Sequence, residues 1–473
     1  MPSRWPVPST ALAILWAATR RSDLRRSISS PALSFEPRFQ AKVNCCLDDE
    51  CADFLPWLER KAGAEVSSVL SIGKSVHGRA LCANKAIKSG VCIMRIPFDV
   101  QLSPDNLSPQ LKSSMGKDIG HVAKLALVVL MEQKLGMHSE WAPYISRLPL
   151  PGESNSTIFW SENELAMVSK SLVYEETMHK KRKMITEFQA IKRTIASSTS
   201  LSEDVIFEDF KHAYSLVESR AWGSCSGYSL IPFADFVNHD GLSKAIVLHD
   251  EDKRLSEVIS DRDYASGEEV LISYGKLPNS ILLVDFGFTL SHNIHDEVSM
   301  QINVSKEDPL FKLKAHLLER HCSPGQRISK DLTPQAHSFI IREVRSVEGK
   351  GTGIPQSLRA AVRVLACTSS CELRDMTEEA ALNDGRLGRR PLKNPDREIQ
   401  AHYILKSRIA QVIKDHESSI MILRPLDLLG HSKPERRRLM AYHLLTGELR
   451  VLKSASAWVI NHIRNLQEQR ATD

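Results

Sequence analysis

The sequence predicts an α+β fold in which a β-rich unit is interrupted by a helical insert and followed by a mostly helical tail. Three observations predict it. Short β-prone runs separated by glycine, serine and proline occupy residues 69–96 and return at residues 228–273. Helical periodicity fills residues 102–222 between them and dominates again after residue 300. Strands that are segregated from helices in this way indicate an α+β unit rather than a parallel sheet.

Length and composition are those of a globular protein with more than one core. The chain has 473 residues, of which 42% are hydrophobic and 25% charged, so two or more domains are expected. The nine cysteines contain no CxxC pair, which argues against a structural zinc site. We expect no metal, and we expect reduced thiols rather than a disulfide framework.

The net charge of +5 is confined to the first 43 residues. This segment carries 7 basic and 2 acidic residues, which leaves 55 basic and 55 acidic residues in the rest of the chain. It is rich in arginine and serine and poor in acids, as organelle transit peptides are. The apolar run 11–18 could instead be the core of a secretory signal, but the arginine pairs that follow it argue against this interpretation. The composition does not separate chloroplast from mitochondrion.

Charge and apolar patterning disfavour two classes of partner. A broad positive footprint for nucleic acid is not present in the neutral remainder of the chain, so nucleic-acid binding is disfavoured. No apolar run approaches the ~20 residues that a membrane span needs. We therefore expect neither a nucleic-acid nor a membrane partner.

The first half of the chain is predicted element by element from its periodicity. A short amphipathic helix over 53–63 precedes β-like runs at 69–72, 80–83 and 91–96. The insert contains a mostly apolar helix over 120–135, a charged helix over 172–195 and a third helix over 207–221. Apolar residues of the third helix recur at steps of three and four, and Gly223 is expected to end it.

Strands return in the middle of the chain. They are expected at 228–233, as a hairpin over 245–249 and 255–259, and at 269–273. A short helix begins at Pro278 and closes at Gly287. Flexible loops are expected at 349–353 and 383–396 within the helical tail.

Two of the strand-like segments end in polar groups. Asn238 and His239 follow the apolar Val237 directly, and Tyr274 follows the run 269–273. Polar groups on apolar segments need partners or a ligand. Each alone is more often a satisfied histidine in a turn or a packed tyrosine than a site, but together they indicate a pocket.

Four segments in this order give the chain a family resemblance. They are the run 77–83 with its Gly78-Arg79 pair, the run 219–222 around Arg220, the run 235–239 that ends in Asn238-His239, and the run 273–275 with Asp285-Phe286-Gly287 after it. The pattern resembles the SET-domain protein-lysine methyltransferases, in particular the plant Rubisco large subunit methyltransferase group. The resemblance covers residues 50 to 465 and includes the 139–144 and 156–161 stretches.

The resemblance implies a cofactor site and a reaction. S-adenosyl-L-methionine would be the methyl donor, and the transfer to a lysine amine depends mainly on orientation. Backbone groups of His77, Gly78 and Arg79 would bind the methionine part of the cofactor. Asn238 and His239 would bind it as well, with the histidine side chain structural.

The resemblance also implies a catalytic residue and a substrate channel. Tyr274 would be the catalytic tyrosine beside the transferring methyl group. Arg220 would pair with the cofactor's carboxylate and border the substrate, and Asp235 would face the lysine channel. Two positions depart from the pattern: Phe286 stands where a second tyrosine is common, and Ser224 where longer polar groups occur. These departures put the substrate and the number of methyl groups in question.

The resulting expectation is an organellar, S-adenosylmethionine-dependent protein-lysine N-methyltransferase, in the chloroplast or alternatively the mitochondrion. Residues 1–43 would be the transit peptide, 50–300 a SET domain with its insert at 102–222, and 301–473 a helical domain that binds the protein substrate. We expect a monomer. The alternative from another class is a SET-fold scaffold that binds a partner through its helical tail and transfers nothing.

Overall fold

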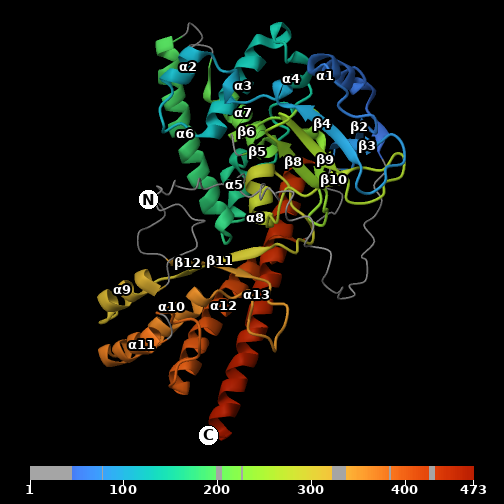
Figure 1. The fold of residues 1–473 in the computed structure, drawn as a ribbon. Coiled ribbons are helices and arrows are strands. Elements are labelled where there is room, and N and C mark those ends of the chain that lie inside the picture. The colour runs from blue at the N-terminus through green and yellow to red at the C-terminus, as the bar shows by residue number, and fades with distance from the viewer. Residues whose placement is uncertain are drawn as a thin grey trace. The chain divides into compact units, whose positions relative to one another are not determined.

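The computed structural model describes residues 45–76, 78–198, 205–224, 227–321, 337–382, 385–424 and 432–472, and the segment predicted as a transit peptide lies outside them. They form two compact units (Figure 1). The N-terminal unit contains residues 45–154 and 179–276, and the C-terminal unit contains residues 155–178 and 277–472. Each unit is thus assembled from two separate stretches of chain.

Small sheets form the β part of the N-terminal unit. Their strands are β1 (Cys46–Leu47), β2 (Leu70–Ser75), β3 (Gly78–Ala83), β4 (Cys92–Pro97), β5 (Trp222–Ser224), β6 (Gly227–Ser229), β7 (Asn238–His239), β8 (Ile246–Asp250), β9 (Leu255–Ile259) and β10 (Leu271–Ile272). The sheets have the orders β1-β2-β3 and β4-β9-β8, with the pairs β5-β6 and β10-β7. Of these pairings, β10 with β7 is parallel and the others are antiparallel.

Helices of the insert cover this unit. They are α2 (Pro109–Ser114), α3 (His121–Leu135), α4 (Ala142–Ile145), α6 (Leu172–Ser198, its later part) and α7 (Phe207–Arg220), and α1 (Phe54–Ala62) precedes them. Every residue of α3 from Val122 to Leu130 except Lys124 is buried, as its apolar composition predicts. Glu187 on α6 accepts the N–H of Gly120 at 3.0 Å and so satisfies a donor at the start of α3.

A disulfide joins Cys45 to Cys82, so the expectation of reduced thiols is wrong for these two residues. The odd number of scattered cysteines had suggested reduced thiols. It gave no hint of this pairing, because the two cysteines lie 37 residues apart in the sequence. They meet because β1 pairs with β2, and β2 pairs in turn with β3. Cys46, Cys51, Cys92, Cys367 and Cys371 are free thiols.

The C-terminal unit is mostly helical, as predicted. Its elements are α5 (Glu162–Ala166), α8 (Asn279–Ile281), β11 (Glu297–Ile302), α9 (Phe311–His321), β12 (His337–Arg342), α10 (Gln356–Ala366), α11 (Ser370–Leu382), α12 (Pro395–Leu423) and α13 (Lys433–Thr472). The long helices α12 and α13 lie side by side (Figure 1). They bury Leu405, Ile409 and Val451 in the main core of the unit.

A second, smaller core of this unit draws on three distant parts of the chain. Trp160 and Val173, from the stretch before residue 178, pack with Leu283 and with Leu444 of α13. The apolar periodicity of the tail is therefore accounted for by burial within this unit.

A buried ion pair also stabilises the C-terminal unit. Arg363 on α10 and Glu398 on α12 are joined with an Nε···Oε2 distance of 2.8 Å.

The α+β prediction is confirmed, and the differences lie at element ends. The helix expected to reach Gly223 ends at Arg220, because Ala221 is extended and Trp222 begins β5. The strand expected over 228–233 is confined to Gly227–Ser229. The helix begun at Pro278 passes into a π-helical turn over Leu282–Phe286 and closes at Gly287 with φ +77°.

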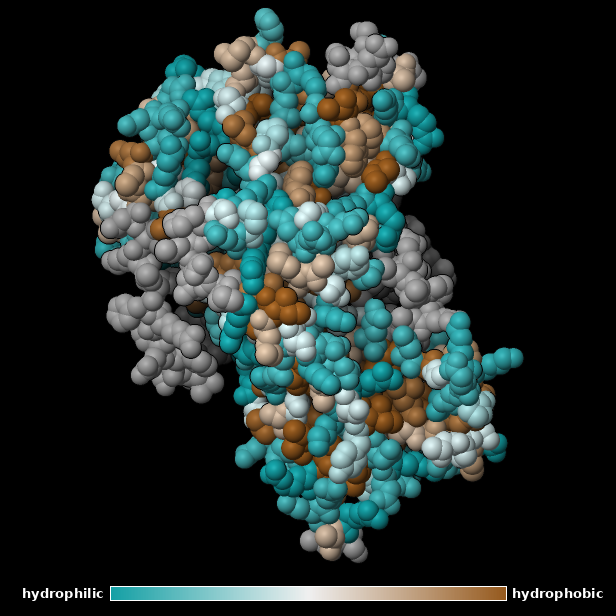
Figure 2. Space-filling model, turned by 180° about the vertical axis from the view of Figure 1, so that it is seen from behind, coloured by the Kyte–Doolittle hydropathy of each residue, from teal (hydrophilic) through white to brown (hydrophobic). Residues whose placement is uncertain are grey.

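Hydrophobic residues on the face shown in Figure 2 form groups among hydrophilic ones. Within the ranges that the structure describes, no helix combines the length and the apolar character that crossing a membrane requires.

Candidate functional site

The parallel pair β7–β10 brings together the two segments that the sequence singles out. Asn238 pairs with Leu271 and His239 with Ile272, so Tyr274 follows directly beyond the pairing. The turn that leads into β7 is strained: Phe233 is fully buried and has φ +77°. Backbone conformations of this kind are costly for a bulky residue and cluster at functional sites.

Tyr274 is fixed at both its backbone and its hydroxyl. The hydroxyl donates to the carbonyl oxygen of Val237 at 2.6 Å, and the backbone N–H donates to Nδ1 of His239 at 3.0 Å. The two rings stack with their centroids 4.9 Å apart. Burial raises the pKa of Tyr274 well above its usual range, so the phenol stays neutral. Because Nδ1 of His239 accepts, a neutral His239 carries its proton on Nε2.

Asn238 connects the pocket to strand β3. Its amide nitrogen donates to the carbonyl oxygen of Arg79 at 3.1 Å and to Oε1 of Glu269 at 2.8 Å. Glu269 is buried. The side-chain amide therefore links the beginning of β3 to β7. The predicted cofactor contact of Asn238 is left to its side-chain oxygen and its backbone groups.

Asp235 and Arg220 lie in contact. Nη1 of Arg220 donates to the main-chain oxygen of Asp235 at 2.9 Å and lies 3.7 Å from carboxylate Oδ2. Burial raises the pKa of Asp235 to about 6, against the opposing effect of Arg220. Nε of Arg220 is buried without a hydrogen-bond partner among the described residues, so the guanidinium retains a donor for a further anion.

Tyr144 completes this group, and sequence reasoning did not assign it a role. Its hydroxyl donates to Oδ2 of Asp235 at 2.8 Å, and the tyrosine is fully buried. The only sequence signal was its place in the 139–144 stretch that resembles the methyltransferases. Glu269 was also missed, since a glutamate at the start of an apolar run gives no hint that it is buried.

Gly78 and Arg79 stand at the beginning of β3. Gly78 has φ +98°, and a Cβ built there would meet nothing within 4 Å, so the backbone is open to close approach. The Arg79 side chain turns away to Asp48, at 3.4 Å, and to the carbonyl oxygen of Arg147. The side chain of Arg79 is thus structural, while its backbone remains available for the predicted role.

Three predicted residues lie outside the described part of this group. His77 lies outside the described residues. Ser224 ends strand β5, and its side chain also lies outside them. Phe286 belongs to the C-terminal unit, where it ends the π-helical turn and contacts Phe288 with a centroid distance of 6.3 Å. The predictions for these residues stay predictions.

One group of side chains in the described ranges has the composition of a metal site. It consists of Glu398, His402 and His462 in the C-terminal unit, with possible ligand atoms within 4.8 Å of one another. Both carboxylate oxygens of Glu398 are engaged by Arg363. Arg359 and Arg363 also depress the pKa of His462 after burial has lowered it. This positive surrounding disfavours a cation at the cluster.

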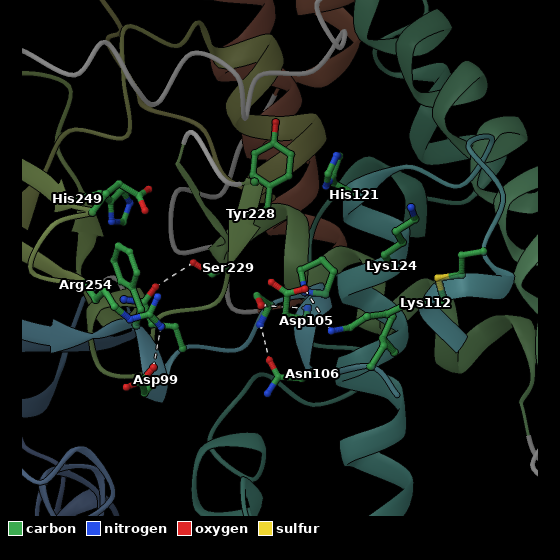
Figure 3. Close-up of a pocket in the computed structure, with 18 residues that line it drawn as sticks. Asp99, Asp105, Asn106, Lys112, His121, Lys124, Tyr228, Ser229, His249 and Arg254 are labelled. Atoms are coloured by element: carbon green, nitrogen blue, oxygen red, sulfur yellow. Dashed lines mark hydrogen bonds and ion pairs between the residues drawn. The ribbon is translucent and has the colours of Figure 1, made fainter. Parts of the chain in front are cut away.

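A cavity of about 550 Å³ opens elsewhere on the N-terminal unit (Figure 3). Arg254 pairs with Asp99 at 2.9 Å, and Lys112 pairs with Asp105 at 3.2 Å. None of the residues predicted for the pocket lines this cavity. Its charged groups are mainly paired with one another, and they supply no group for the chemistry described above.

The geometry converges on a group rich in hydrogen-bond acceptors. The carbonyl of Val237, the oxygen of Tyr274 and the carboxylate of Asp235 are brought together by β7, β10 and the short helix before them. Such a group can bind a nitrogen that carries hydrogen and can stabilise positive charge as it develops there. No side chain in the group needs to become a nucleophile.

Comparisons with known proteins agree with this fold. Residues 78–275 match the SET domain, and residues 305–452 match the Rubisco LSMT substrate-binding domain. A structure of Rubisco LSMT bound to AdoMet superposes with a TM-score of 0.68 at 21% identity, covering 90% of this chain and 96% of that one. A SET domain of LSMT bound to lysine and AdoHcy gives 0.68 at 20% identity, with coverages of 90% and 95%.

Curated relatives point to the same class with a different acceptor. The actin-histidine N-methyltransferase of Mus musculus is 23% identical over 90% of this chain and 71% of its own length. That of Homo sapiens is 23% identical over 86% of this chain and 68% of its own. The two matched domains, in this order, are those of SET-domain protein methyltransferases. This chain carries a SET domain followed by the Rubisco LSMT substrate-binding domain.

Proposed function

We propose that this protein is a protein-lysine N-methyltransferase that uses S-adenosylmethionine and acts on an organellar protein. The observation that carries the proposal is the arrangement of the Tyr274 hydroxyl on the Val237 carbonyl, with Asp235 and Arg220 beside it. These groups orient an amine and favour the charge that it gains. The methyl group comes from the sulfonium of the cofactor, which supplies the leaving group.

The residues present fit S-adenosylmethionine. The open backbone at Gly78 allows close approach of its methionine part. The buried Nε of Arg220, unpartnered among the described residues, suits the carboxylate of that part. Backbone groups of Asn238 and His239 lie on β7, which the Asn238 amide links to the Arg79 carbonyl of β3. These residues bind and orient the donor, and the neutral phenol of Tyr274 presents its oxygen to the transferring methyl.

A histidine acceptor is the second candidate, because the curated relatives are named as actin-histidine methyltransferases. The two candidates are separated by where the methyl group is found. Purified protein is incubated with labelled cofactor and either plastid or mitochondrial extract, or actin, and the modified residue is located by mass spectrometry. Methyl-lysine in an organelle protein supports the proposal, whereas methyl-histidine alone would replace the lysine acceptor with histidine.

The scaffold alternative is motivated by Phe286, which carries no hydroxyl where a tyrosine is common in the resembling group. Calorimetry with S-adenosylmethionine decides between the two classes. A protein that binds the cofactor and transfers label is an enzyme. Failure to bind the cofactor, with partner capture by the C-terminal unit retained, would favour the scaffold.

The remaining parts of the proposal concern place and partner. The arginine-rich segment 1–43 directs the protein to the chloroplast, with the mitochondrion as the alternative. A fluorescent fusion of residues 1–43 tests this assignment. The domain at 301–473 binds the protein substrate, the protein acts as a monomer, and the 50–300 region carries out the transfer.

A further inference from the structure

Tyr144 and Asp235 form a buried contact that the proposed chemistry does not yet use. The Tyr144 hydroxyl, on α4, donates to Oδ2 of Asp235 at 2.8 Å. Arg220 lies 3.7 Å from the same oxygen. The side chains of Tyr144 and Asp235 are both buried. The contact joins the helical insert to the short helix Ala234–Phe236 that leads into β7.

The other carboxylate oxygen of Asp235 has no such partner. Oδ1 is buried, and no described residue hydrogen-bonds to it. A buried acceptor left open in this way costs free energy unless a ligand or water satisfies it. One oxygen is therefore held by Tyr144, while the other has no hydrogen-bond partner among the described residues, in a group of side chains that also includes Tyr274.

We propose that Tyr144 is a positioning residue that keeps Asp235 ionised and turned so that Oδ1 accepts a hydrogen bond from the target nitrogen. This inference rests on the proposed methyl transfer. Asp235 is the group that would touch the substrate, and Tyr144 acts only through it.

The charge that develops during transfer explains why an ionised Asp235 helps. The bond between nitrogen and the methyl carbon forms as the bond between that carbon and sulfur breaks, and its electron pair stays on sulfur. The nitrogen becomes positive, and a carboxylate that accepts its N–H stabilises this charge. A proton leaves the methylated nitrogen to water afterwards. A neutral Asp235 would lose most of this effect.

The surroundings of Asp235 make its ionisation depend on Tyr144. The groups that act on it are Arg220 on α7, Tyr144 on α4, Tyr274 after β10 and, through its charge alone, Arg79 on β3. Burial raises the pKa of Asp235 to about 6, while Arg220, the Tyr144 hydroxyl, the backbone N–H of Asp235 itself and Arg79 lower it. Removal of the Tyr144 hydroxyl takes away a donor to the charged form, so the pKa rises further.

The test is the pH profile of kcat/KM for Tyr144→Phe, from about pH 5.5 to about pH 9. We expect the acid limb to move to higher pH by roughly one unit, with a plateau at high pH within a few-fold of the unchanged protein. Tyr264→Phe is the matched control, because it removes another buried tyrosine hydroxyl that donates to an aspartate, Asp261 at 3.1 Å. The acid limb of the kcat/KM profile of Tyr264→Phe should lie at the same pH as in the unchanged protein. An equal loss at every pH in Tyr144→Phe would overturn the inference.

A second readout does not depend on activity. Thermal unfolding of Tyr144→Phe should show a loss of Tm that is larger at about pH 8 than at about pH 5, because the charged form of Asp235 is the one deprived of its donor. A loss that is the same at both pH values would also overturn the inference. If the unchanged protein transfers no methyl group but this pH dependence is present, the proposed function fails while the control of Asp235 by Tyr144 stands.

Discussion

The hydroxyl of Tyr274 donates a hydrogen bond of 2.6 Å to the carbonyl oxygen of Val237. Because this bond uses the phenolic hydrogen, the tyrosine oxygen is presented to the pocket as an acceptor. His239 stacks on the ring and accepts the backbone N–H of the same residue. The orientation of Tyr274 is thus held by Val237 and His239, the residues on either side of Asn238.

Tyr274→Phe should abolish most of the methyl transfer while leaving cofactor affinity nearly unchanged. The variant keeps the ring and its stacking but lacks the oxygen that we propose faces the transferring methyl. Loss of one such polar group lowers kcat by roughly 10²- to 10³-fold. Single-turnover kinetics beside calorimetry measure the two quantities. A fully active variant would remove Tyr274 from the catalytic role.

Arg220→Ala should weaken S-adenosylmethionine binding by roughly tenfold or more, as expected for a lost hydrogen bond between charged groups. The same change removes the cation beside Asp235, so the pKa of that carboxyl should rise above about 6. Calorimetry measures the affinity. Arg95→Ala is the control, since that arginine pairs with Glu257 at an exposed position, and equal affinities of the two variants would contradict the assignment.

Reduction of the Cys45–Cys82 disulfide should lower the stability of the N-terminal unit. The bond closes a separation of 37 residues, for which the chain-entropy treatment gives an upper value of about 4 kcal/mol. Thermal unfolding with and without reductant measures the effect. Cys45→Ser should unfold at the reduced wild-type temperature in either condition. Cys371→Ser, at an exposed free thiol, should retain the dependence on reductant.

Asp296 should make the C-terminal unit less stable as the pH rises. Burial, reinforced by Glu448 and Glu343 and opposed by Arg450, raises its pKa to about 7. A raised pKa in the folded state means that its contribution is complete below the unfolded pKa and is lost as the pH rises through about 7. The loss is on the order of a few kcal/mol at most.

The test of this dependence is Asp296→Asn, which keeps an acceptor for the N–H of Asn279, bonded at 3.0 Å in the wild type. Its unfolding temperature, compared with that of the wild type between about pH 4.5 and about pH 8, should decline less steeply. Parallel declines in the two proteins would show that another group causes the wild-type behaviour.

The sequence predicted those parts of the site that lie in short, continuous segments. Asn238, His239 and Tyr274 could be found because each interrupts an apolar run, and β7–β10 pairing then brings them together. Tyr144 could not be found in this way. It lies 91 residues from Asp235, and a tyrosine in a short helix looks the same whether its hydroxyl meets water or a buried carboxylate.

The fold shows the same division between local and distant information. Helix α3 and the hairpin β8–β9 follow from periodicity and turn residues, which act within a few positions. The Cys45–Cys82 bond depends on how β1, β2 and β3 assemble, and no local pattern carries that. The left-handed conformation of Phe233 is likewise imposed by its surroundings, since a phenylalanine does not favour it.

The second core of the C-terminal unit has a consequence for the order in which the protein matures. Trp160 and Val173 leave the ribosome long before Leu444, which they pack against in the finished core. At translation rates of roughly 5–20 residues per second, this apolar stretch waits more than ten seconds for its cover. During that time the nascent chain exposes a surface on which chaperones can act, although the strands and helices completed by residue 276 can already assemble. Because the second core combines early and late parts of the chain, the apolar stretch stays exposed until α13 has emerged from the ribosome.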